Sequence, residues 1–301
     1  MSARSLQLID LVTGVNEVVA REVYGDQNVF VNEITHDSKN ISSGCLFCCV
    51  VGENVDGHEF AVEAIKNGAS AILVERKLNV DVPQIVVDDV RTAMGYFAAE
   101  FFGRPSSKLK VIGITGTNGK TTTAHLLASV LRQHGLVTAV FGTLSGARTT
   151  PEATDLQRSL ANEFERGCNA VVMEVSSHAL SLCRVAGTRF AETIFTNLGQ
   201  DHLDFHGSMD EYFSAKSKLF TQQYTDTCIV NRDDHYGAKL IVILNEKNEV
   251  NLETFGINDA SQIVAEVDQL SFVWRGEKVQ LVTGGYFNVM NALAAANAAA
   301  K

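Results

Sequence analysis

The segment from Val111 to Gln133 constrains the fold of this chain more than any other part of the sequence. The apolar run Val111–Ile114 has the composition of a buried strand, and the glycine-containing turn Thr115–Gly119 follows it. Gly-Lys-Thr comes next, and the apolar residues of Ala124–Gln133 have the spacing of a helix. This order is typical of a phosphate-binding loop, although Ile114 stands where the strict motif has glycine.

Each part of such a loop has a physical role. Glycines let backbone N–H groups point at phosphate oxygens, and a helix N-terminus adds partial positive charge. The Lys120 ammonium can reach the terminal phosphates of a nucleotide, and the Thr121 hydroxyl can bind magnesium. We therefore expect nucleotide binding rather than a plain strand–helix turn. The residues concerned are Gly116, Thr117, Asn118, Gly119, Lys120, Thr121 and Thr122.

The remaining pattern indicates an α/β chain of two domains. We expect a small N-terminal α/β domain over residues 1–88, with short strands and one helix at Phe60–Asn67. From residue 89 onward, beginning with a helix over Asp89–Phe102, continuous apolar strands alternate with helices, which indicates a central domain with a mainly parallel sheet. Its predicted strands are Val111–Ile114, Val137–Phe141, Ala170–Val175, Thr193–Phe195 and Cys228–Val230.

Composition excludes several classes of protein. The 301 residues carry a formal charge of −10, so a general nucleic-acid binder with a basic face is not expected. Six cysteines are too few for a disulfide scaffold, and Cys45, Cys48 and Cys49 lie in an apolar run that favours buried strand packing over a metal site. The N-terminus has no secretory pattern, and Leu281–Ala300 is a poor membrane span, so we expect a cytoplasmic protein without membrane contact.

Four further segments accompany the loop, namely Thr35-His36-Asp37-Ser38-Lys39, Thr149-Thr150-Pro151-Glu152, Met173–Leu180 and Thr196–Gly207. Together with the loop they resemble the Mur ligases of cell-wall synthesis. The resemblance implies a UDP-binding N-terminal domain and a central ATPase domain of the phosphate-loop type. It also implies a third domain, so we expect the sequence to be truncated within the helix that begins at Phe287. The family's Asp-Asn-Pro-Arg-type motif, which selects the incoming amino acid, is absent from these residues.

The resemblance implies a cluster of cation-binding residues next to the loop. Glu174 follows an apolar strand and would bind magnesium, although a solvated acid at a strand end is the plainer interpretation. His202 would bind a second magnesium, but magnesium prefers oxygen, so Asp201 could equally supply this contact. Lys216 would carry a carbamate, with Lys218 as the competing residue. With Lys120, the residues Glu174, His202 and Lys216 form the expected catalytic set.

The family's substrate contacts also have counterparts in this sequence. Arg184 suits a carboxylate or phosphate, although Leu182 stands where the family often has glutamine. Asn288 and Asn291 would approach the nucleotide, and the alternative interpretation is that either one only caps or buttresses its helix. The other expected substrate-binding residues are Ser38, which could also be a turn serine, and Glu53, Asn54, Val55, Thr149, Thr150 and Ser176.

The implied reaction is an ATP-dependent, magnesium-dependent ligation. A diamino acid, meso-diaminopimelate or L-lysine, would be joined to UDP-MurNAc-L-Ala-D-Glu through an acyl-phosphate intermediate. Without a third domain to orient the amine, we expect this chain alone to be inactive as a ligase and to be a monomer. Two alternatives remain, namely a nucleotide- and UDP-dipeptide-binding fragment without ligase activity, and an unrelated phosphate-loop ATPase.

Overall fold

The computed structural model describes residues 4–18, 20–52, 54–144, 148–201 and 203–300, and the chain divides into two compact units. The first unit comprises Met1–Pro105, Pro151–Asn162 and Leu182–Thr188. The second comprises Ser106–Thr150, Glu163–Ser181 and Arg189–Lys301. Helix α5 (Ala153–Glu165) begins in the first unit and ends in the second.

The first unit contains a five-stranded sheet in the order β2-β7-β6-β5-β4. Strand β2 is antiparallel to β7, and the other neighbours are parallel. The strands are β2 (Glu22–Tyr24), β4 (Glu33–Thr35), β5 (Cys45–Cys48), β6 (Ala69–Val74) and β7 (Gln84–Val86), and β1 (Leu6–Gln7) pairs separately with β3 (Phe30–Val31). The helices are α1 (Leu8–Gly14), α2 (Ala61–Lys66), α3 (Val90–Phe101) and the short 3₁₀ helix η1 (Gly57–Phe60).

Two expectations for this unit are confirmed. The apolar runs form the predicted strands, because each is buried by side chains on both faces of the sheet. The three neighbouring cysteines are also buried, Cys45 and Cys48 within β5 and Cys49 directly after it. They pack in the strand region as small apolar side chains, as predicted.

The structure differs from the domain boundary predicted near Asp88. Helix α3, which we assigned to the second domain, packs in the core of the first unit, where Met94 and Phe97 share a cluster with Leu46 and Leu73 of the sheet. The chain first passes from the first unit to the second after Pro105. The Asp89 side chain caps α3, but a cap marks where a helix begins and does not determine which sheet its apolar face covers.

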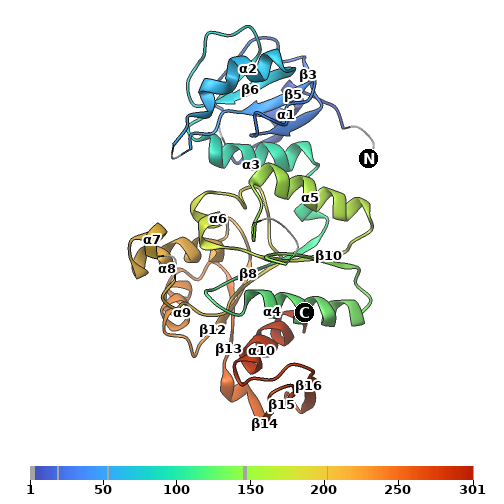
Figure 1. The fold of residues 1–301 in the computed structure, drawn as a ribbon, viewed down its shortest axis with the longest axis vertical. Helices are drawn as coiled ribbons and strands as arrows, with labels where there is room; N and C mark the ends of the chain where they lie inside the picture. Colours follow the sequence, from blue (N-terminus) through green and yellow to red (C-terminus); the bar gives the residue numbers. More distant parts are fainter. Residues whose placement is uncertain (1–3, 19, 53, 145–147, 202, 301) are drawn as a thin grey trace. The chain divides into compact units, whose positions relative to one another are not determined.

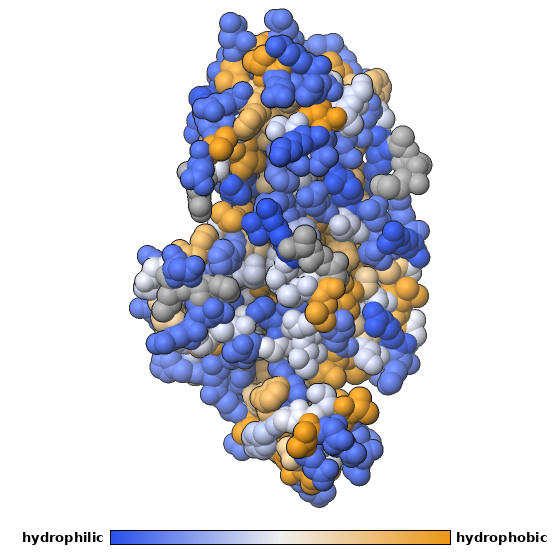
Figure 2. Space-filling model, viewed as in Figure 1, coloured by the Kyte–Doolittle hydropathy of each residue, from blue (hydrophilic) through white to orange (hydrophobic). Residues whose placement is uncertain are grey.

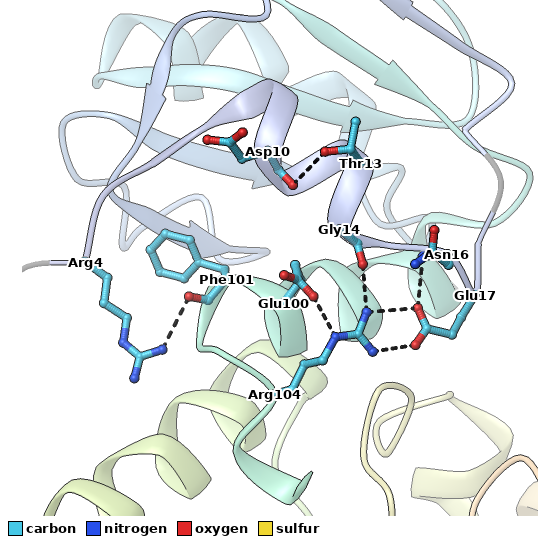
Figure 3. A network of polar contacts seen from close by, with 9 residues as sticks. All are labelled: Arg4, Asp10, Thr13, Gly14, Asn16, Glu17, Glu100, Phe101 and Arg104. Atoms are coloured by element: carbon cyan, nitrogen blue, oxygen red, sulfur yellow. Dashed lines mark hydrogen bonds and ion pairs between the residues drawn. The ribbon is translucent and has the colours of Figure 1, made fainter. Parts of the chain in front are cut away.

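Arg104 joins the end of α3 to the end of α1 (Figure 3). Its guanidinium donates to the Gly14 carbonyl at 2.8 Å and pairs with Glu100 at 2.6 Å and with Glu17 at 2.5 Å. Glu17 and Glu100 raise the pKa of the Arg104 guanidinium, and Arg104 in turn holds the pKa of Glu17 below its ordinary value. This network fixes the chain where it leaves the first unit.

The second unit is built on six parallel strands in the order β13-β12-β11-β8-β10-β9. They are β8 (Lys110–Thr115), β9 (Thr138–Phe141), β10 (Ala170–Glu174), β11 (Glu192–Phe195), β12 (Thr227–Asn231) and β13 (Asn251–Phe255). The first five confirm the predicted strands and the mainly parallel sheet. The edge strand β13 was not predicted, because only Phe255 of its five residues is buried and its sequence has no continuous apolar run.

Helices α4 (Lys120–Gln133) and α10 (Phe287–Ala299) lie side by side against this sheet (Figure 1). Helix α4 begins at Lys120, earlier than the predicted start at Ala124, so Thr121 and Thr122 belong to its first turn. The other helices are α6 (Ser177–Ser181), α7 (Leu203–His206), α8 (Met209–Ser217), α9 (His235–Lys247) and the 3₁₀ segments η2 (Pro105–Ser107), η3 (Lys218–Phe220) and η4 (Ile257–Asp259).

A small antiparallel sheet of β14 (Ala260–Ala265), β15 (Leu270–Trp274) and β16 (Glu277–Leu281) precedes α10. It was not predicted, since β14 and β16 are largely exposed and only Leu270 and Phe272 of β15 are buried. Hydrophilic residues predominate on the face of the molecule drawn in Figure 2. Among the described residues, no helix has the length and apolar character needed to span a bilayer.

Candidate functional site

The turn between β8 and α4 requires glycine, because the chain after β11 approaches its backbone closely. Gly116 has φ +156°, and a Cβ there would lie 2.0 Å from the Thr196 hydroxyl oxygen. The Asn118 backbone is held by the Asn197 side chain, which accepts from its N–H at 2.9 Å and donates to its carbonyl at 3.0 Å. Neighbouring strand ends therefore fix the loop from one side, and the first turn of α4 presents N–H groups without helical partners.

Lys120 folds back over this loop. Its ammonium donates to the carbonyl oxygens of Gly116 at 2.8 Å and Thr117 at 2.9 Å. Burial lowers the pKa of this amine, and the negative charges of Glu174 and Asp201 oppose the shift. The ammonium thus lies at the loop, where a phosphate group could replace backbone carbonyls as its partner.

The Glu174 carboxylate, at the end of β10, accepts hydrogen bonds from the start of α4 and from the segment after β9. The Thr121 hydroxyl donates to its Oε2 at 3.0 Å, and Thr143 donates its backbone N–H to Oε1 at 3.0 Å. The side chain is almost completely buried, with 1% of the residue exposed. A buried carboxylate next to a hydroxyl at a helix N-terminus supplies the oxygen ligands that Mg²⁺ prefers. This arrangement disfavours the solvated-acid alternative.

Lys216 is buried on α8, whereas its competitor Lys218 is exposed. The Lys216 ammonium donates to the Gly116 carbonyl at 3.0 Å and lies 4.8 Å from the centre of the Tyr212 ring. Burial, and then the charge of Lys120, lower the pKa of Lys216 to about 7, against an opposing contribution from Asp201. The neutral amine that carbamylation requires is therefore accessible near neutral pH.

A cavity of about 540 Å³ opens beside the loop on the side of α10. Amide side chains and large apolar side chains both line it, a combination that suits a flat heterocycle with polar edges. The lining residues are Asn118, Gly119, Thr122, Thr196, Asn197, Asn231, Phe255, Phe287, Met290 and Asn291.

The two asparagines of α10 have different positions. Asn291 lines the cavity, and its Oδ1 accepts from the Thr123 hydroxyl at 3.4 Å. Asn288 accepts from the Asn291 amide at 2.9 Å and donates to the Gly284 carbonyl at 2.7 Å. Asn291 thus faces the cavity, and Asn288 is bonded to Asn291 and to the backbone before the helix.

The candidate substrate residues of the second unit surround Glu174. The buried Thr150 hydroxyl donates to the Glu174 carbonyl at 3.0 Å and accepts from the Ser176 N–H at 3.1 Å. The Thr149 hydroxyl lies 3.1 Å from that of Thr143. The Ser176 hydroxyl accepts from the Ala179 N–H at 3.2 Å, at the start of α6. These contacts fix the conformation of the chain at the end of β10.

The remaining candidates belong to the first unit. Ser38 lies in a turn in which the Asp37 carboxylate accepts from the Lys39 N–H at 3.0 Å. Asn54 and Val55 are exposed, in a loop closed by the Gly52 N–H and the Val55 carbonyl at 2.9 Å. Arg184 forms an ion pair with Glu152 at 2.9 Å. Glu53 and His202 lie outside the described residues.

Several residues of the site were not predicted. Thr196 and Asn231 line the cavity at the ends of β11 and β12, and the Asn231 amide donates to the Thr196 carbonyl at 2.7 Å. The Tyr212 hydroxyl lies 3.2 Å from that of Thr117, and the Tyr212 ring stacks on His206. Polar residues that follow buried strands were the available signal, because parallel sheets bind ligands at those strand ends.

Comparison with known families and proteins agrees with this geometry. The model of the Mur ligase middle domain matches residues 114–299, and the model described as the Mur ligase family catalytic domain matches residues 31–102. UDP-N-acetylmuramoyl-L-alanyl-D-glutamate–2,6-diaminopimelate ligases are similar in sequence. The one from Aquifex aeolicus is 47% identical over 71% of this chain and 46% of its own length, and the one from Geobacillus kaustophilus is 39% identical over 96% and 63%.

Solved structures of the same kind are similar in fold. A UDP-N-acetylmuramoyl-L-alanyl-D-glutamate–2,6-diaminopimelate ligase superposes with a TM-score of 0.81 and 27% identity, over 93% of this chain and 61% of that one. The MurF ligase from Thermotoga maritima in complex with ADP has a TM-score of 0.59 and 23% identity, over 88% and 62%. The chain thus spans less than two thirds of the length of each of these proteins.

These matches exclude an unrelated phosphate-loop ATPase. Since the match to the middle domain alone, residues 114–299, covers more than half of the 301 residues, the chain belongs to the Mur ligase family.

Proposed function

We propose that this chain carries the nucleotide- and UDP-substrate-binding parts of an ATP-dependent ligase that adds diaminopimelate to UDP-MurNAc-L-Ala-D-Glu. The observation that carries the proposal is the convergence of Lys120, Glu174 and Lys216 on the loop that ends β8. The similar ligases from Aquifex aeolicus and Geobacillus kaustophilus are diaminopimelate ligases, which favours diaminopimelate over lysine as the amino acid.

The nucleotide would lie along the loop and into the neighbouring cavity. Backbone N–H groups of Gly119 to Thr122 would bind the phosphates at the start of α4, and the Lys120 ammonium would turn from the Gly116 and Thr117 carbonyls to the terminal phosphate. The base would occupy the cavity of about 540 Å³ beside Asn291. ADP in the Thermotoga maritima MurF structure is consistent with a nucleotide ligand for this fold.

Magnesium fits the residues present at the end of β10. Glu174 and Thr121 offer a carboxylate and a hydroxyl oxygen 3.0 Å apart, and a carbamate on Lys216 would supply a further anionic oxygen. Bound there, the ion would reduce the repulsion between the nucleotide and a substrate carboxylate. We propose Glu174, Thr121 and modified Lys216 as ligands of magnesium, with His202 as a ligand of a second magnesium ion.

The chemistry begins with two anions that repel one another. The side-chain carboxylate of D-glutamate attacks the γ-phosphorus of ATP, the bond between the γ-phosphorus and the bridging oxygen breaks, and ADP leaves. Lys120 and the loop N–H groups stabilise the charge that develops on the transferred phosphoryl group. An amine then attacks the acyl-phosphate carbon, and phosphate leaves as the amide forms.

The UDP-MurNAc-dipeptide would be held by Ser38, Glu53, Asn54, Val55, Thr149, Thr150, Ser176 and Arg184. We further propose a magnesium-dependent monomer in the cytoplasm, with no nucleic-acid or membrane partner. The six cysteines are all free, which suits a reducing compartment. A nucleotide- and UDP-dipeptide-binding protein without ligase activity remains the second candidate function.

Hydroxylamine trapping tests the proposed activity without the incoming amino acid. An acyl-phosphate reacts with hydroxylamine to give a hydroxamate and phosphate, so the chain is incubated with ATP, Mg²⁺, UDP-MurNAc-L-Ala-D-Glu and hydroxylamine. We expect a hydroxamate of the UDP-dipeptide by mass spectrometry, absent with Lys120→Met. Tight binding of both substrates without any hydroxamate would favour the second candidate function, and failure to bind either substrate would contradict both.

A further inference from the structure

Two candidate substrate-binding segments, distant in sequence, belong to the same compact unit. The turn after β4 carries Ser38, the candidate contact for the uridine diphosphate end of the substrate. The segment Pro151–Asn162 carries Glu152, which pairs with Arg184, the candidate contact for the dipeptide end. All of these residues belong to the first unit, although Pro151–Asn162 lies within the range of the middle-domain match.

Arg158 bridges these two segments. Its guanidinium pairs with Asp155 on its own helix at 2.8 Å and with Glu33 of β4 at 3.0 Å, and it donates to the Ile34 carbonyl at 3.2 Å. The side chains of Arg158 and Glu33 are 29% and 30% exposed, so the pair is partly removed from water. Because the planar Arg158 guanidinium donates to two carboxylates and a carbonyl, it fixes both the position and the orientation of α5 relative to β4.

A second contact also joins the start of α5 to the residues that follow β4. The His36 Nδ1 lies 3.0 Å from the Thr154 hydroxyl oxygen, four residues before Arg158. His36 directly precedes the turn of Ser38, and this turn is shaped by the Asp37 N–H, which donates to the Thr35 hydroxyl at 3.1 Å. The start of α5 is therefore attached to β4 and to the beginning of the Ser38 turn.

We propose that Arg158 is a positioning residue that holds the Ser38 turn and the Glu152–Arg184 pair at a fixed separation. The inference rests on the proposed function, because it assigns the two segments to the two ends of one UDP-linked dipeptide. Arg158 touches no substrate. It makes binding at one end favour binding at the other, because a preformed spacing avoids the cost of ordering the second segment.

The test compares a ligand that reaches one segment with a ligand that reaches both. UDP and UDP-MurNAc-L-Ala-D-Glu are titrated by calorimetry into the full chain and into Arg158→Met. Arg166→Met is the matched control, because Arg166 also pairs three residues back along its segment, with Glu163 at 2.8 Å, but its side chain is 72% exposed. Arg158→Lys keeps the charge and loses the fork.

We expect Arg158→Met to bind UDP as the unaltered chain does and to bind the UDP-dipeptide about tenfold more weakly, the size of one lost charge-assisted contact. Arg158→Lys should lie between the two, and Arg166→Met should match the unaltered chain. Equal UDP-dipeptide affinity in Arg158→Met and the unaltered chain would overturn the inference while leaving the proposed function intact. Parallel weakening of UDP would also overturn it, since that indicates general damage to the fold.

Failure of the unaltered chain to bind the UDP-dipeptide would remove the proposed function, and with it this role for Arg158. Thermal unfolding of each variant accompanies the titrations. A lowered midpoint in Arg158→Met with unchanged relative affinities would mean that the bridge only stabilises the fold, and this result would also contradict the proposal.

Discussion

The clearest prediction concerns Gly119, the residue directly before helix α4. Its φ of +84° lies in the left-handed region, and a Cβ there would lie 2.3 Å from the Asn291 Oδ1. Gly135, directly after the C-cap of the same helix, has φ +85° and nothing within 4 Å of its Cβ position. Replacing each glycine by alanine therefore gives the same backbone cost, and only Gly119→Ala adds a collision.

These contacts give the expected difference in unfolding free energy between the two variants. The left-handed conformation costs a residue with a Cβ about 1–2 kcal/mol, which both variants share. In Gly119→Ala, Asn291 must move and weaken its hydrogen bonds to Asn288 at 2.9 Å and Thr123 at 3.4 Å. At about 1 kcal/mol for each neutral hydrogen bond, Gly119→Ala should lose about 2 kcal/mol more unfolding free energy than Gly135→Ala.

Urea unfolding measures the stability difference, and calorimetric titration with ADP and Mg²⁺ measures its consequence for the site. Because Asn291 lines the cavity next to the loop, Gly119→Ala should bind ADP more than about tenfold more weakly, while Gly135→Ala should bind it normally. Equal stability and equal ADP affinity in the two variants would refute the assignment of loop and cavity to one nucleotide site.

Three further predictions concern the charged residues at the loop. Lys120→Met should weaken binding of a non-hydrolysable ATP analogue by roughly 30-fold in calorimetry, the size of about 2 kcal/mol for a charge-assisted contact. Glu174→Gln should raise the Mg²⁺ concentration needed for that binding by more than about tenfold, because a neutral amide is a poor magnesium ligand. An unchanged Mg²⁺ requirement would remove Glu174 from the metal site. Lys216→Met should raise stability in ligand-free, bicarbonate-free buffer, most at low pH. Since the pKa of Lys216 falls from 10.5 to about 7 on folding, the unfolded chain binds more protons between these values. Stability of the unaltered chain therefore rises with pH across this range, and the advantage of the variant in urea unfolding should disappear above it. A constant advantage at every pH would contradict the buried amine as its cause.

The parallel sheet and the loop could be predicted because their signals are local. A continuous apolar run such as Ala170–Val175 and the Gly-Lys-Thr sequence each lie within a few residues. The three-stranded sheet of β14 to β16 could not, since Ser261 and Gln262 are exposed and only Leu270 and Phe272 of its strands are buried. The start of α4 was placed late because Thr121 and Thr122 have little helical preference, and the preceding turn with Gly119 at the N-cap sets the start of the helix instead.

The candidate site shows the same division. Lys120, Glu174 and Lys216 were singled out with the help of the family resemblance, and the structure brings them together around one loop. Thr196 and Asn231 stand at the ends of buried strands, which is a local signal, but that they line one cavity depends on the strand order. The same holds for α3, whose apolar face could have covered either sheet. Burial of Lys216, in contrast to Lys218, also depends on tertiary packing.

A crystal structure with a non-hydrolysable ATP analogue and Mg²⁺ tests the central claim most directly. We predict that the terminal phosphates contact the Lys120 ammonium and the N–H groups at the start of α4, with the base beside Asn291 and the metal on Glu174. A triphosphate bound away from the turn between β8 and α4, or a base outside the cavity next to α10, would contradict the account.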